Sequence, residues 1–174
     1  MKKQSSLLLI LMLLLVLAGC GAKSAPTEPP ELTVTNAQGA SITAMGGSYD
    51  WDYEAGGGQR TGAIACGMHP LDETLRDSTP ALEMPIAVSA SFYYTVTLDF
   101  GDCAPDSVTL RYWNEQCWGD TQATAEKLTV QRQDDGTYTV ELFPSVGIFE
   151  VDAQWDTEDY CGRAFYSFCT KAAE

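Results

Sequence analysis

Basic residues and histidine are scarce in this chain. Its 174 residues include 10 Lys and Arg against 24 Asp and Glu, with a single histidine, so the formal net charge is −14. Proteins bind nucleic-acid backbones chiefly through Lys and Arg, and they dock on anionic lipid through basic patches. We therefore expect no nucleic-acid partner and no docking of the protein surface on charged lipid.

The sequence also lacks the signatures of common catalytic centres. It has no Gly-x-Ser-x-Gly elbow and no Cys-x-x-Cys pair, and His69 is the only histidine. Hydrolysis by a nucleophile needs a base beside an activated Ser or Cys. His69 lies between Met68 and Pro70, a place that suits a bend in which the ring bonds to backbone. We expect no enzyme; a hydrolase using paired carboxylates is a remaining alternative, although no pair stands out.

Only one long apolar run is present, Leu7 to Ala18, and it is too short for the roughly 20 residues that span a membrane. Lys2 and Lys3 precede it, and Leu17-Ala18-Gly19-Cys20 ends it. This arrangement resembles the type II signal peptide of bacterial lipoproteins. The resemblance implies removal of residues 1–19 and a diacylglycerol on Cys20, with acyl chains such as palmitate. Two chains anchor a protein stably, so we expect it on the extracytoplasmic face of the cell membrane.

The lipid would be followed by a linker and one domain. Residues 20–31 contain three prolines and few apolar side chains, so we expect a lipidated cysteine with a semi-extended stalk. Residues 32–171 are long enough for one well-cored domain. Loss of Lys2 and Lys3 would bring its formal charge from −14 to −16.

Apolar residues alternate with polar ones almost throughout this domain, which predicts half-buried strands. In Tyr93 to Phe100, even-numbered residues point one way; in Ile148 to Trp155, odd-numbered residues face inward. Gly56-Gly57-Gly58 and Asp134-Asp135-Gly136 predict hairpin loops. Further strands are expected at 32–35, 41–44, 49–54, 61–66, 86–89, 108–113, 127–132 and 137–142. Only 71–76 and 121–127 are capable of a helical turn. About ten short strands predict an antiparallel β-sandwich, with a barrel as the alternative.

Five cysteines follow Cys20, and outside the membrane such residues favour disulfides. They are Cys66, Cys103, Cys117, Cys161 and Cys169. Cys161 and Cys169 bracket one predicted strand, which would hold them about 26 Å apart, far beyond the roughly 7 Å that a disulfide tolerates. Cys103 and Cys117 flank another strand and are the favoured pair, but the sequence does not choose among the remaining pairings.

Four segments together are similar to uncharacterised lipoproteins of Gram-positive, clostridial-type bacteria. They are GSYDWDYEAGGG, ACGMHPLD, RYWNEQCWGD and GIFEVDAQWDTEDYCGRAFYSF, which lie between Gly47 and Phe168. In the last segment, Ala153 and Trp155 end one aromatic strand, and Gly162, Ala164, Tyr166 and Phe168 lie in the next. The resemblance implies an immunoglobulin-like domain and carries no catalytic residue.

Two groups of side chains are candidates for ligand binding. Alternation places Trp113 outside its strand, beside Trp118 in the following loop, and an exposed tryptophan pair suits a sugar or a protein partner. The second group comprises carboxylates that would suit calcium if their segments meet. These are Asp50, Asp52, Glu54, Asp156, Glu158 and Asp159. Solvated acidic surfaces are the simpler interpretation of this second group, and we expect no other cofactor.

The sequence therefore predicts a non-enzymatic, membrane-anchored lipoprotein that acts as a protein-interaction or cell-envelope module. The alternative is a carbohydrate-binding module with an aromatic platform, stabilised by calcium. Replacement of Trp113 and Trp118 would separate these two hypotheses.

Overall fold

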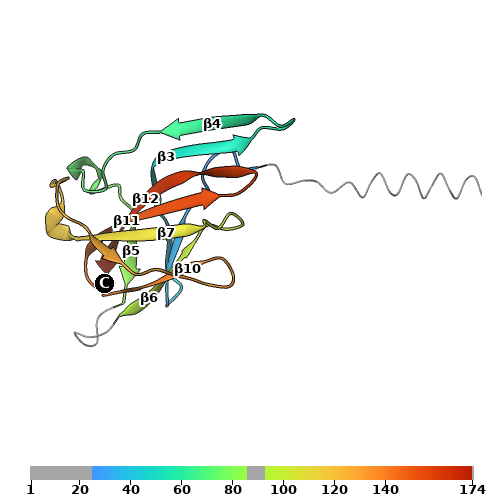
Figure 1. Ribbon diagram of the computed structural model, residues 1–174. Coiled ribbons are helices and arrows are strands. Elements are labelled where there is room, and N and C mark those ends of the chain that lie inside the picture. Colours follow the sequence, from blue (N-terminus) through green and yellow to red (C-terminus); the bar gives the residue numbers. More distant parts are fainter. Residues whose placement is uncertain (1–24, 86–92, 174) are drawn as a thin grey trace, which may run out of the picture.

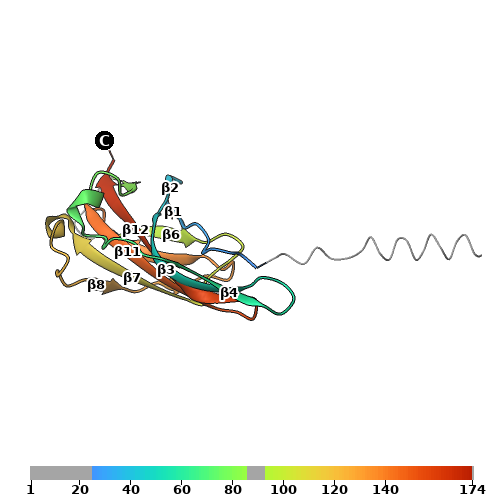
Figure 2. The same cartoon turned by 90° about the horizontal axis from the view of Figure 1, so that it is seen from above.

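Alternating side chains on short strands build two sheets packed face to face. The computed structural model describes residues 25–85 and 93–173. Figure 1 shows the two layers, and Figure 2 shows them from above, with the first described residues (blue) toward one end and the C-terminus at the other. The predicted antiparallel β-sandwich is confirmed, with twelve strands in the described residues instead of about ten.

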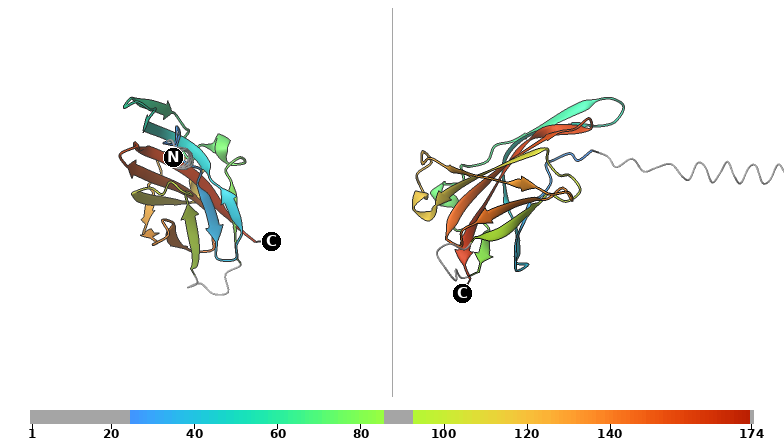
Figure 3. Two further views of the ribbon diagram at one scale, coloured as in Figure 1. Left: turned by 90° about the vertical axis from the view of Figure 1, so that its right-hand side faces the viewer. Right: turned by 60° about the horizontal axis from the view of Figure 1, so that its bottom comes forward.

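The smaller sheet has the strand order β2-β1-β6-β10-β9, and the larger has the order β4-β3-β12-β11-β7-β8 with β5 added beside β12. The strands are β1 (Thr33–Asn36), β2 (Ser41–Thr43), β3 (Met45–Glu54), β4 (Arg60–Ala65), β5 (Ala81–Met84), β6 (Tyr94–Asp99), β7 (Ser107–Asn114), β8 (Glu126–Leu128), β9 (Gln131–Arg132), β10 (Tyr138–Leu142), β11 (Gly147–Asp156) and β12 (Tyr160–Ala172). Short 3-10 helices lie at η1 (Glu73–Leu75) and η2 (Glu115–Cys117). Figure 3 shows how the sheets lie across one another.

The inward faces of both sheets supply the core. Val34, Val96 and Leu98 come from the smaller sheet, and all three are fully buried. From the larger sheet, Trp51 and Trp155 meet edge to face with ring centroids 5.1 Å apart. The predicted inward residues of β11 are among the buried core, so the alternation in this strand is confirmed.

The hairpin glycines adopt the backbone geometry that their turns require. Gly56, Gly57 and Gly58 all have positive φ between β3 and β4, and Gly136 has φ of 88° between β9 and β10. A left-handed backbone costs glycine little because it has no Cβ. Both predicted hairpin loops are confirmed.

Several local predictions differ from the structure. Residues 121–127 form turns leading into β8 and not a helix, because Ala123 and Ala125 pack against the Trp113 cluster. The segment 127–132 divides between the two sheets as β8 and β9. The pairing of β5 with β12 is parallel, unlike every other pairing of the described strands. The strand expected at 86–89 lies outside the described residues.

The last residues of the predicted stalk lie against the sandwich. The Trp51 indole N–H donates a hydrogen bond to the main-chain oxygen of Pro26 at 2.8 Å, and the Tyr166 hydroxyl donates to that of Pro30 at 2.7 Å. Both donors are core aromatic residues. Pro26 and Pro30 of the predicted stalk are therefore hydrogen-bonded to the domain through their main-chain oxygens.

Candidate functional site

Trp113 is buried, so the predicted exposed tryptophan platform is not formed. Its side chain does point away from the main core, as predicted, but it is only 4% exposed and packs with Leu71 and Ile148. Its indole N–H donates to the main-chain oxygen of Ala123 at 3.0 Å. Trp118 is half-buried against the same cluster. The expectation of an exposed Trp113 is wrong because segments on both sides of β7 in the sequence fold over its outer face.

His69 lies beside Trp113, in the segment that covers it. Its Nδ1 accepts a hydrogen bond from the main-chain N–H of Leu71 at 3.2 Å, as the bend between Met68 and Pro70 suggested. Its ring lies 5.9 Å from that of Trp113. Burial and the nearby Arg111 lower the pKa of His69. A neutral ring bonded to backbone fits a structural role.

The five cysteines of the described residues are free thiols, so the prediction of structural disulfides is wrong in this structure. Cys103 and Cys117 lie beyond opposite ends of β7, whose eight residues extend for about 26 Å. Cys161 and Cys169 both lie on β12, so the exclusion of that pair is confirmed. Cys169 is packed against the Trp113 cluster, and burial raises the pKa of its thiol to about 12.

The six carboxylates proposed for calcium come from segments that do meet at one end of the larger sheet. The main-chain N–H of Glu54 donates to the main-chain oxygen of Asp159 at 2.9 Å. However, Asp52 and Asp156 pair with Cys161 from opposite sides, which separates their Cα atoms by about 10 Å. Among the described residues, no three acidic, histidine or cysteine side chains come close enough to hold a metal ion. The segments are neighbours, but no calcium ligand set is assembled there.

A cluster of charged residues that the sequence did not single out lies on the outer face of the larger sheet. The Arg163 guanidinium makes two hydrogen bonds to the Asp152 carboxylate, at 2.7 and 2.5 Å, and Arg111 pairs with Glu150 at 2.9 Å. Both guanidinium groups lie over the Phe165 ring, that of Arg111 at 5.6 Å and that of Arg163 at 4.7 Å from the ring centroid. Burial raises the pKa of Glu150. Each guanidinium group is thus paired with a carboxylate. The cluster therefore stabilises the sheet face and offers little unpaired charge to a ligand.

A second feature that the sequence did not reveal is a cavity of about 180 Å³ at the open edge between β8 and β10. We call it the edge slot. Its lining includes four aromatic rings and two carboxylates, from Tyr93, Tyr112, Phe143, Phe149, Glu126 and Glu141. Tyr93 and Phe143 are 58% and 39% exposed, and their rings meet at 5.9 Å with an angle of 68°. Alternation could not find this slot, because its rings come from four separate segments.

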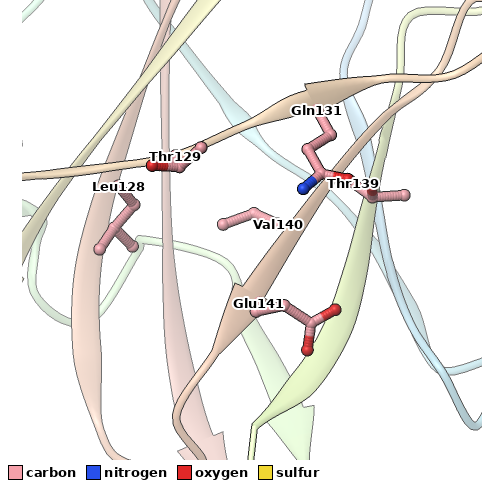
Figure 4. A pocket seen from close by; sticks show the side chains of 6 residues that line it. All are labelled: Leu128, Thr129, Gln131, Thr139, Val140 and Glu141. Atoms are coloured by element: carbon pink, nitrogen blue, oxygen red, sulfur yellow. The ribbon is translucent and has the colours of Figure 1, made fainter.

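Beside the edge slot, and sharing lining residues with it, is a cavity of about 230 Å³ that we call the edge groove. Leu128 and Glu141 line both, and the groove also has Thr129, Gln131, Thr139 and Val140, whose side chains appear in Figure 4. It lies where the chain leaves β8 in one sheet to form β9 in the other. The slot and groove together form a concave surface that has exposed aromatic side chains at one end.

No protein-family model matches this chain, and comparison with curated proteins and with solved structures finds no match either. What the molecule itself defines is an antiparallel β-sandwich with an aromatic slot at one edge. Its immunoglobulin-like character and its kinship with clostridial-type lipoproteins stay predictions. In the part of the chain that the structure describes, no helix is long and apolar enough to cross a membrane.

Proposed function

We propose that this chain is a non-enzymatic lipoprotein, anchored through Cys20 at the extracytoplasmic face of the membrane, whose β-sandwich binds a protein partner. The observation that carries this proposal is the placement of the edge slot relative to the N-terminal segment. Trp51, which holds Pro26, pairs with Gly162 on β12, whereas Phe149 of the slot pairs with Phe168. Gly162 and Phe168 lie six residues apart along β12, a distance of about 20 Å.

The docked N-terminal segment would keep the domain near the lipid. Cys20 precedes Ala25, the first described residue, by five positions. A fully extended chain of that length spans at most about 17 Å. With Pro26 held at Trp51, the β3–β4 hairpin end (Figure 1) would face the bilayer. The edge slot would then be presented away from the bilayer, because Phe149 lies farther along the sheet.

The rival proposal, a carbohydrate-binding module, has lost its predicted platform because Trp113 is buried. The exposed aromatic pair Tyr93 and Phe143 does not replace it, since the two rings are inclined at 68° and share no plane. Exposed aromatic side chains with a neighbouring polar rim are typical of protein-interaction sites. The geometry therefore favours a protein partner over a sugar.

Lipidation is tested by growing the producing cells with an alkyne-tagged fatty acid and following the tag on the protein. We expect Cys20→Ala to remove the label and to release the protein from the membrane fraction. Cys66→Ala is the matched control, because it removes an exposed cysteine of the domain. Label that persists in Cys20→Ala would refute anchoring at this position.

The partner is tested by crosslinking the lipoprotein in intact cells and identifying the attached molecules by mass spectrometry. We expect one reproducible protein, lost when the exposed Phe143 is replaced by Ala. Recovery of cell-wall or host glycan without protein would refute the interaction proposal in favour of carbohydrate binding.

A further inference from the structure

The edge slot has the composition of a site for an organic cation. Tyr112 on β7 pairs directly with Glu126 on β8, so their side chains lie on the same, inner side of the sheet. The exposed Glu126 carboxylate therefore stands at the mouth of a slot whose walls include the rings of Tyr112, Phe143 and Tyr93. A cation over aromatic faces is attracted by their quadrupoles, and the carboxylate adds a full charge.

Charge favours the same class of ligand. No lysine, arginine or histidine is among the described residues that line the edge slot or the edge groove. The whole chain carries a formal charge of −14, so its field draws cations and repels anions. Glu141 also lines the slot, and its carboxylate accepts a hydrogen bond from the hydroxyl of its cross-strand partner Thr95 at 2.6 Å.

The volume of the slot limits what enters it. At about 180 Å³ it is smaller than the cavities that hold drug-sized molecules, which measure roughly 300–1,000 Å³. A single long side chain is of the right scale. The ligand that best fits the slot is therefore one side chain of a larger molecule.

The neighbouring strand edge can hold the backbone of that molecule. On one side β10 pairs with β6 from Tyr138 to Leu142, but on the other side β9 covers only Tyr138 and Thr139. The pairings of the described strands thus leave Val140 to Leu142 bonded on one side, beside the edge groove (Figure 4). An extended peptide commonly adds to such an edge through main-chain hydrogen bonds.

We propose that the edge groove binds an extended segment of a basic partner protein along β10 and that the edge slot takes one lysine or arginine side chain of that segment. This inference rests on the proposed function, because it names the partner surface and its chemistry. Glu126 would pair with the cationic head, and Tyr93, Tyr112 and Phe143 would surround its apolar stem, as aromatic sites with a nearby carboxylate do.

The test uses the protein purified in detergent from the cells that make it, and a fluorescent octapeptide in which lysine alternates with valine and tyrosine. We expect saturable binding by fluorescence polarisation. Glu126→Gln and Phe143→Ala should each weaken it about threefold to tenfold, the scale of one ion pair and of one cation–aromatic contact respectively. Glu158→Gln, which removes the same charge from an exposed loop at the other end, is the matched control.

Peptide variants decide which part of the ligand is recognised. Replacement of all four lysines by norleucine keeps the stems without the charges and should weaken binding at least as much as Glu126→Gln does. The proposal would be overturned if the norleucine peptide bound as tightly as the lysine peptide. It would also be overturned if Glu126→Gln and Glu158→Gln weakened peptide binding equally. Tetramethylammonium that binds as tightly as the peptide would overturn the peptide-groove part in favour of a small-cation site. These outcomes do not depend on Cys20, so they are distinct from failure of the lipid anchor.

Discussion

The indole N–H of Trp51 donates a hydrogen bond to the main-chain oxygen of Pro26 at 2.8 Å, which joins the N-terminal segment to the centre of the aromatic core. Trp51 is 2% exposed and stacks on Tyr160 with ring centroids 5.3 Å apart. Pro26, which lies between the predicted lipid anchor and the domain, is thus hydrogen-bonded to a buried residue of the core. Several predictions on stability and reactivity depend on such contacts.

Removal of the Tyr166 hydroxyl should loosen the N-terminal segment. Tyr166→Phe leaves the Pro30 oxygen without its donor, and we expect a loss of about 1 kcal/mol in the free energy of unfolding. Amide hydrogen exchange in residues 26–31 should also become faster. Tyr93→Phe, which removes a hydroxyl from an exposed ring, should change stability by less than about 0.5 kcal/mol. Identical exchange in both variants would contradict the docking of this segment.

Truncation of Trp113 should act on stability. Trp113→Ala opens a cavity between Leu71 and Ile148 and should cost about 3–5 kcal/mol, measured by urea unfolding. Trp118→Ala should cost less, because that side chain is half-buried. A stable Trp113→Ala variant that lost retention on a glycan column would instead restore the tryptophan platform.

Gly162 should not tolerate a side chain. A Cβ at this position would collide with the main-chain oxygen of Asp50 and would lie 2.9 Å from Cε3 of Trp51. Overpacking of this kind costs about 1–3 kcal/mol, so Gly162→Ala should lower the urea midpoint clearly. Gly46→Ala is the control, since its Cβ meets no atom within 4 Å. Equal midpoints for the two variants would show that β3 and β12 are less closely packed than the structure has them.

Glu150 should make the protein less stable as the pH rises. Burial raises the pKa of this carboxyl, against the opposing effect of Arg111, so the folded protein binds the proton more tightly than the unfolded chain. Stability is then lost as pH increases from the unfolded pKa, near about 4.3, through the higher folded value. Glu150→Gln should remove this slope. The free energy of unfolding of the variant should therefore rise relative to that of the parent protein between about pH 4 and about pH 7. Urea unfolding across that range, with Glu158→Gln as control, measures the effect; a constant difference would contradict it.

The five thiols of the domain should differ widely in reactivity. Burial raises the pKa of Cys169 to about 12, and the thiolate is the reactive form, so Cys169 should resist iodoacetamide in the native protein. Cys66 is exposed and should be alkylated first. Peptide mass mapping after timed alkylation gives the order, and rapid modification of Cys169 would show that the cluster around it opens readily. Protection of Cys66 until a reductant is added would show a disulfide that the structure lacks.

Alternation of side chains determined the class of fold. The patterns in β6, β10 and β11 each assign one face to the core, and two half-buried sheets can bury those faces only against each other. Glycine runs likewise determined the two hairpins. These features depend on neighbours in the chain, so they could be predicted from the sequence.

Tertiary structure decided what covers the outer faces. The pattern of β7 correctly turned Trp113 away from the core, but Leu71 and Ala123, which bury it, come from segments on either side of that strand in the sequence. The edge slot similarly requires Tyr93, Glu126 and Phe143 to converge from separate segments. A period of two fixes the side of the sheet on which a residue lies, whereas its exposure depends on long-range packing that no local pattern encodes.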